Sequence, residues 1–161
     1  MAVLFTSDTH FGDHRPLNIG KRPFASVAEM DESLVAGWNA MVGQGDEVWH
    51  LGNVARRPAE VPALLERLNG AKHLLVGNND PRQTITSEGW ASVRDYAELM
   101  LDGRVLVLCH YPFRSWNGQA RGAINLHGHS HGRLKSMPRQ FDVGVDARDW
   151  RPVTLAELLA P

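Results

Sequence analysis

Histidines and side chains with carboxylate or amide groups recur in this sequence directly after apolar runs. The first run, residues 2–6, is followed by "SDTH", which contains Asp8 and His10. A late run is followed by "GHSHG", in which His129 and His131 have the same spacing of two residues. Carboxylate and imidazole groups are common ligands of divalent cations in proteins. These residues therefore predict a metal site whose ligands come from distant parts of the chain.

Three further apolar runs end in residues of similar chemistry. The segment "VWHLGNV" places Asn53 in a turn, "LVGNND" contains Asn78, and "LVLCHYP" contains His110. Ligands of α/β sheets bind outside the carboxyl ends of the strands, so we expect these loops to converge at one rim. An amide oxygen such as that of Asn78 is a weaker ligand but a usable one.

Each motif alone also has a structural interpretation. The segment "DTH" is compatible with an Asx turn that caps the next element, and "GNND" with an ordinary loop turn. His110 alone is compatible with a core histidine. The joint occurrence of all these motifs at successive strand ends favours the metal site.

The elements that must position these residues are predicted from periodicity and turn residues. The first half of the chain alternates strands with helices, which predicts parallel βαβ units. The second half is rich in strands, and Asp102-Gly103 between two apolar runs predicts a hairpin. Ser26 and Glu29 predict an N-terminal capping box. We expect strands at 2–6, 47–51, 72–76, 97–101, 104–110, 123–127 and 139–146, helices at 27–41, 57–70 and 154–159, and an irregular segment at 84–96.

Composition limits the class of protein. The 161 residues fit a single domain, 1–161, and the formal net charge of -1 argues against a binder of membranes or long nucleic acids. A small anionic substrate remains compatible with this charge. Cys109 is the only cysteine and lies in an apolar run, which predicts a buried thiol, no internal disulfide and a cytoplasmic location. The N-terminus shows neither a signal peptide nor a transmembrane span.

The series "SDTH", "GN", "GNND", "CH" and "GHSH" resembles the signature of the calcineurin-like metallophosphoesterases. That signature reads D-x-H, GD, GNH followed by an acid, H and GHxH. The resemblance extends over nearly the whole chain and is strongest to the compact branch found in bacteria and phages. It implies an α/β fold, a four-layer α-β-β-α sandwich with mixed sheets. It also implies hydrolysis of phosphomonoesters or phosphodiesters, including nucleotides or cyclic nucleotides, by a metal-bound hydroxide.

The resemblance assigns the ligands residue by residue. It implies two divalent ions, for which manganese is the first expectation and Fe, Zn, Co or Ni are alternatives. The first ion would take Asp8, His10 and His131, and the second would take Asn78, His110 and His129. The bridging aspartate of the family falls on Asn53.

Two positions depart from the family pattern. Asn53 is neutral, so we expect at least one ion to bind weakly and the activity to be impaired, whether the residue is natural or introduced. The alternative is that Asn53 still bridges through its oxygen. Asn79 stands where the family has a histidine that contacts the phosphate, and an amide cannot deliver a proton. This predicts a preference for good leaving groups or phosphodiesters, with His14 and His50 as other candidate acids.

Several residues are candidates for supporting roles. Arg114 and Trp116 follow His110 and could bind a phosphate and stack on a base, although an exposed arginine and a core tryptophan explain them equally well. Lys21 or Arg22 could line the pocket.

Three acidic residues are candidates for orienting the site. Asp142 and Asp146 could hydrogen-bond the back of a ligand histidine, or they could equally form turns, and Asp80 could orient its loop.

Three function hypotheses follow. The first is a phosphoesterase that acts on a small phosphorylated substrate. The second is a family member that binds metal or a phosphorylated ligand without turnover, and Asn53 and Asn79 are the residues that support this hypothesis. The third is a nucleic-acid module, which the net charge disfavours.

Overall fold

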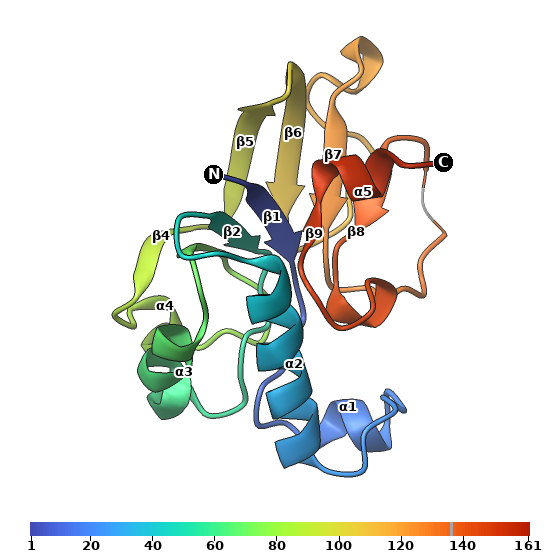
Figure 1. Ribbon diagram of the computed structural model, residues 1–161. Helices are drawn as coiled ribbons and strands as arrows, with labels where there is room; N and C mark the ends of the chain where they lie inside the picture. The colour runs from blue at the N-terminus through green and yellow to red at the C-terminus, as the bar shows by residue number, and fades with distance from the viewer. Residues whose placement is uncertain (136) are drawn as a thin grey trace.

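The computed structural model describes residues 1–135 and 137–161, which form two packed β-sheets with helices against one of them (Figure 1). The first sheet has the order β4-β3-β2-β1-β9, in which β1 to β4 are parallel and β9 is antiparallel to β1. Its strands are β1 (Val3–Thr6), β2 (Glu47–His50), β3 (Ala71–Leu75), β4 (Trp90–Arg94) and β9 (Val153–Thr154).

The second sheet has the order β5-β6-β7-β8. Strands β6, β7 and β8 are parallel, and β5 is antiparallel to β6. Its strands are β5 (Tyr96–Leu101), β6 (Arg104–Cys109), β7 (Ile124–His127) and β8 (Gln140–Asp142). Asp102 and Gly103 join β5 to β6 with φ angles of 50° and 73°. Two left-handed residues are what a two-residue type I′ hairpin needs, so the predicted hairpin is confirmed.

The helices are short except for α2. Ser26 begins α2 by accepting a hydrogen bond from the backbone N–H of Glu29, as predicted. The Glu29 carboxylate accepts a hydrogen bond from the backbone N–H of Ala25, whereas a capping box would use that of Ser26. No helix in the described part of the chain has the length and apolar character of a membrane span. The helices are α1 (Arg15–Asn18), α2 (Val27–Met41), α3 (Val61–Arg67), α4 (Arg82–Ile85) and α5 (Leu155–Leu159), with 3-10 turns η1 (Pro58–Glu60), η2 (Gln119–Arg121) and η3 (Val145–Ala147).

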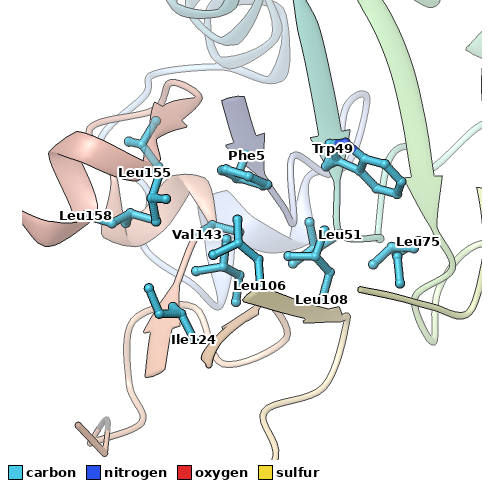
Figure 2. Packing of buried hydrophobic residues seen from close by; sticks show 13 residues of the cluster. Phe5, Trp49, Leu51, Leu75, Leu106, Leu108, Ile124, Val143, Leu155 and Leu158 are labelled. Carbon is cyan, nitrogen blue, oxygen red and sulfur yellow. The ribbon is translucent and has the colours of Figure 1, made fainter. Parts of the chain in front are cut away.

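The main hydrophobic core lies between the two sheets. Phe5 and Trp49 of the first sheet pack against Leu106 and Leu108 of the second, and α5 closes the edge with Leu155 (Figure 2). A second core fills the space between the first sheet and helices α2 and α3, where the largest buried side chains are Trp38, Met30, Leu4 and Leu65. Burial of these side chains from both sides fixes the first sheet and hence the position of its strand ends.

The expected α/β sandwich fold with two mixed sheets is confirmed, and one outer layer is reduced. In the described residues, the outer face of the second sheet is covered by the segment around η2 and by Met137 instead of an α-helix. Val107 of β6 packs there against Trp116 and Ala123. The irregular segment at 84–96 contains the end of α4 and all of β4, which extends the first sheet at its edge.

Candidate metal centre and active site

The loops that follow β1, β2, β6 and β7 are joined at one rim, where the two sheets meet. The backbone N–H of Asp8 donates to the carbonyl of Gly52 at 2.9 Å, and that of Gly128 donates to the carbonyl of His110 at 2.9 Å. The backbone N–H of His129 donates to the Asp8 carboxylate at 2.8 Å, which ties the first sheet to the second. The predicted convergence of these loops is therefore present in the structure.

Asp8, His10 and His131 form a cluster that could hold a metal ion. One ligand atom from each of them lies within 4.8 Å of the others. The Nε2 atoms of His10 and His131 are both 3.8 Å from Asp8 Oδ1, and the two rings are stacked with centroids 5.4 Å apart. One ion with bonds of about 2.1 Å can bridge such separations.

The Asp8 carboxylate is the clearest sign of an ion. Its Oδ2 accepts hydrogen bonds from Ser7 Oγ at 2.9 Å and from the His129 N–H at 2.8 Å. Its Oδ1 is buried and has no hydrogen-bond partner among the described residues. Burial raises the pKa of Asp8 to about 6, against an opposing effect of His131. A buried carboxylate oxygen without a partner is costly, and a divalent cation would satisfy it together with both imidazoles.

Acidic residues orient both histidines toward Asp8. His131 Nδ1 donates to Asp146 at 2.8 Å, and this hydrogen bond raises the pKa of His131. His10 Nδ1 lies 3.6 Å from the Asp13 carboxylate, and burial lowers the pKa of His10 to about 3. In both rings the Nδ1 side faces a carboxylate, so Nε2 is directed at Asp8, as in many metal sites.

The Arg22 side chain holds Asp146 and the loop of Asp8 in place. Its guanidinium makes two hydrogen bonds of 2.9 Å to Asp146 and also donates to the carbonyls of Asp8 and Thr9. Burial alone would raise the pKa of Asp146, but the bonds from His131 and Arg22 lower it. Arg22 is buried, so it positions the loop of Asp8 instead of offering a charge to solvent.

His110 and Asn78 form a second pair of candidate ligands. His110 Nδ1 donates to the Leu51 carbonyl at 2.6 Å, which leaves its Nε2 lone pair 3.0 Å from Asn78 Oδ1. Burial lowers the pKa of His110 and so disfavours a second proton on this ring. Two acceptors that face each other fit a cation. His129 is exposed, and its ring centroid lies 5.2 Å from that of the buried His110.

The Asn53 amide is hydrogen-bonded to the loop after β3. Its Oδ1 accepts a hydrogen bond from the backbone N–H of Asn79 at 2.9 Å, and its Nδ2 donates to Asn78 Oδ1 at 3.1 Å. The Asn79 N–H requires an acceptor, which fixes the orientation of the amide. This hydrogen bond uses one of the two acceptor sites of the Asn53 oxygen, and bridging through that oxygen stays a prediction.

Asp80 holds this loop pair in place, in agreement with its expected role. Its carboxylate accepts hydrogen bonds from the backbone N–H groups of Asn53, Gly77 and Val54 at 2.8, 2.8 and 2.9 Å. The turn after β2 is thereby attached to the turn after β3.

The candidate ligands share an unusual backbone conformation. Among the described residues, ten other than glycine have a positive φ, and five of these are the candidate ligands Asp8, His10, Asn53, His129 and His131. Left-handed backbone is unfavourable for residues with a Cβ, and such conformations concentrate at functional sites.

Three side chains do not make the functional contacts predicted for them. His50 is buried, accepts from the Gly52 N–H at 3.1 Å through Nδ1 and contacts Thr9 Oγ1 at 2.9 Å through Nε2. His50 lines neither cleft described below, so its position argues against a role as general acid, and burial also lowers its pKa to about 3. Trp116 is only 8% exposed, and its indole donates to the Ala123 carbonyl, so it has no free face for a base.

The third is Asp142, whose carboxylate accepts hydrogen bonds from the backbone N–H groups of Gly132 and Gly144 at 2.9 and 2.8 Å instead of from a ligand histidine, in agreement with the turn-forming alternative. Of Asp142 and Asp146, it is Asp146 that hydrogen-bonds a ligand histidine, His131. His14 and Arg114 are exposed and line neither of the two clefts described next.

Two clefts meet at the candidate ligands. The first, named here the α1 cleft, has a volume of about 410 Å³ and is lined by α1, the turn after it, Arg133 and Trp150. The second, the amide cleft, has a volume of about 290 Å³ and is lined by Asn53, Asn78, Arg56 and neighbouring residues. His10, Arg15 and Asn79 line both. Asn79 therefore lies where an amide could contact a phosphoryl oxygen.

Sequence reasoning missed Asp13 and Ser7, which contact His10 and Asp8. The acid in "DTHFGD", three residues after His10, was a signal that could have found Asp13.

The chain is similar to several solved structures. It matches the protein of unknown function AQ665 from Aquifex aeolicus with a TM-score of 0.80 and 20% identity over 97% of this chain and 96% of that one. It matches YfcE, a phosphoesterase from E. coli, with a TM-score of 0.51 and 15% identity over 89% and 78%. The nuclease MPE of Pseudomonas putida gives a TM-score of 0.50 and 21% identity over 82% and 66%. No protein-family model matches the chain.

The chain therefore shares the fold of metallophosphoesterase structures such as the phosphoesterase YfcE and the nuclease MPE. Among curated proteins, the gene 66 protein of Mycobacterium phage D29 is 31% identical over 90% of this chain and 88% of its own length. The uncharacterized protein MJ1445 of Methanocaldococcus jannaschii is 28% identical over 95% and 86%. The chain belongs to the same family as the phage gene 66 protein.

Proposed function

We propose that this protein is a metal-dependent phosphoesterase that hydrolyses small phosphomonoesters or phosphodiesters, with nucleotides and cyclic nucleotides among the candidate substrates. The observation that carries the proposal is Asp8 Oδ1, buried without a hydrogen-bond partner in the described structure and faced by the Nε2 atoms of His10 and His131. The fold and the phosphoesterase YfcE among its structural neighbours support it. When bound, divalent ions supply positive charge for phosphoryl oxygens and a water of lowered pKa.

The chain's own residues prepare the site for this chemistry. Asp146 and Asp13 hold the two histidines with Nε2 toward Asp8. The exposed amide of Asn79 can donate to a phosphoryl oxygen at the junction of the two clefts. Among the described residues that line the junction, none outside the proposed metal ligands is suited to protonate a leaving group, since Asn79 replaces the expected histidine and His50 is buried. Esters with good leaving groups are therefore the preferred substrates.

The two metal positions are expected to differ in affinity. Asp8, His10 and His131 offer one carboxylate and two imidazoles. At the pair of His110 and Asn78, the neutral Asn53 donates an N–H group to Asn78, whereas an aspartate at position 53 would add a negative charge. We expect one tightly bound ion, with manganese first and iron, zinc, cobalt or nickel as alternatives, and a second bound weakly.

A second candidate function is metal or ligand binding without turnover. The hydrogen bonds of Asn53 to Asn78 and Asn79 favour it, because they occupy the groups that would bind the second ion.

Elemental analysis of the protein and of Asn53→Asp, with hydrolysis of p-nitrophenyl phosphate and bis(p-nitrophenyl) phosphate, tests the proposal. We expect about one ion per chain in the protein and about two in Asn53→Asp, with kcat/KM higher by at least about tenfold in the variant. Asn18→Asp is the charge-matched control, because Asn18 is exposed and lines neither cleft. Absence of metal and turnover in both proteins would refute the enzyme function. Two tight ions and full activity with Asn53 would refute the weakened second position.

A further inference from the structure

We infer that the substrate is a phosphodiester with a nucleoside arm that carries an additional phosphate, and that this arm lies in the α1 cleft. The inference rests on the proposed function and specifies its substrate class. It follows from the apolar wall of this cleft, from its unpaired positive charges, and from the second cleft that shares His10 with it.

The position of the α1 cleft makes it part of the reaction site. His10, His131 and Asn79 form its inner end, so a group in this cleft is continuous with a phosphoryl group at the metal cluster. The volume of about 410 Å³ falls in the range of small-molecule sites. A bare phosphate would fill only a small part of it.

One wall of the α1 cleft is apolar. Pro16, Ile19 and Pro23 come from α1 and the turn after it, and Trp150 comes from the loop after η3. Ile19 is 74% exposed, which is high for a large apolar side chain. The Trp150 ring is fixed by edge contact with Phe24, with centroids 5.2 Å apart. A rigid apolar wall beside a phosphate site fits a flat heterocyclic ring.

The charges of the α1 cleft leave a positive excess. Its two carboxylates are already paired, Asp13 with Arg15 at 2.6 Å and Asp146 with Arg22 at 2.9 Å.

Lys21 and Arg133 are exposed and form no ion pair with any described residue. Two free cations, in addition to any metal, fit an anionic group beyond the reacting phosphate. A second phosphate on the same arm supplies that charge.

The amide cleft explains why the substrate is a diester. It shares His10, Arg15 and Asn79 with the α1 cleft and is otherwise lined by polar side chains such as Asn53, Asn78 and Arg56. A phosphodiester has two organic groups, and two clefts that meet at one phosphate site accommodate both. A monoester would leave one cleft empty.

The first test is direct binding, which does not depend on turnover. Thymidine 3′,5′-bisphosphate and thymidine are titrated calorimetrically into the full chain without added metal. We expect the bisphosphate to bind and thymidine to bind at least about tenfold more weakly. We expect Ile19→Asp and Arg133→Glu each to lower the affinity for the bisphosphate by about tenfold. The matched controls are Met100→Asp, 70% exposed, and Arg104→Glu. Both lie on the β5–β6 hairpin, at the opposite end of the molecule from α1 (Figure 1). Equal affinities for the bisphosphate in the unsubstituted protein, the two cleft variants and the two controls would overturn the inference.

The second test compares two diesters with the same leaving group. We expect thymidine 5′-(p-nitrophenyl phosphate) to have a kcat/KM about tenfold above that of methyl p-nitrophenyl phosphate, and this advantage to disappear in Ile19→Asp and Arg133→Glu but not in the controls. Hydrolysis of both diesters at equal rates overturns the inference and leaves the proposed function intact. Bisphosphate binding that the variants lose, without hydrolysis of either diester, supports the cleft assignment and refutes the enzyme function.

Discussion

At the scale of single residues, Asp8 is a candidate metal ligand that lowers the stability of the metal-free protein. One of its oxygens is buried with no donor in the described structure, so the metal-free fold carries the full desolvation cost of that atom. We therefore expect Asp8→Asn to abolish metal binding at the cluster and to raise the unfolding free energy of the metal-free protein by about 1–3 kcal/mol. Urea unfolding in chelator measures the second effect, and elemental analysis the first.

Asp146→Asn is the comparison for that experiment. Its carboxylate is paired with Arg22 and His131, so its loss should destabilise the metal-free protein. Equal destabilisation by both variants would contradict the assignment of Asp8 as an unsatisfied ligand.

Residue types at strand ends predicted a metal site, and the resemblance to a family signature supplied the grouping of its ligands. Asp8, His10 and His131 could be grouped because each follows an apolar run and because the whole motif series was available. The roles of His50 and Trp116 could not be predicted, since these depend on partners remote in sequence or on burial. His50 contacts Thr9, 41 residues away in the sequence, and the indole of Trp116 donates to a carbonyl in the cluster on the outer face of the second sheet.

At the scale of elements, the loop after β7 must approach the loop after β1 very closely. A Cβ on Gly128 would lie 2.0 Å from Ser7 Oγ and 2.5 Å from Asp8 Oδ2. We expect Gly128→Ala to displace one loop, to weaken metal binding by at least about tenfold and to lower the stability by about 1–3 kcal/mol. Metal titration and thermal unfolding measure the two effects.

Gly45→Ala is the control, because a Cβ there would meet no atom within 4 Å. An unchanged metal affinity in Gly128→Ala would show that the two loops do not need this contact.

The elements themselves were predicted well where local signals are strong. Helix α2 and the β5–β6 hairpin have a cap or turn that the sequence encodes locally. The reduced outer layer of the second sheet has no such signal. Whether a segment such as η2 covers a sheet depends on the contacts of Trp116 and Val107 after folding, which periodicity does not report.

At the scale of the whole molecule, the buried histidine His50 makes stability depend on pH. Its pKa is about 3 in the folded protein and close to 6.5 when unfolded, so the unfolded chain binds more protons between these values. Stability is therefore lost as pH falls from about 6.5 toward 3, by up to about 1.4 kcal/mol per pH unit from this residue. Urea unfolding of the metal-free protein between pH 4.5 and 7.5 should show this slope, and His50→Gln should reduce it. An unchanged slope in the variant would assign the dependence to other groups.

The candidate ligands come from loops between residues 8 and 131, and the unfolded chain cannot bring them together. An ion that binds only the folded form adds stability by mass action, about 2.7 kcal/mol when its free concentration is a hundred times its dissociation constant. The folded population then follows the supply of metal. Under metal starvation the chain is open to proteolysis more often, so its abundance in a cell, and not only its activity, would report how much metal is available.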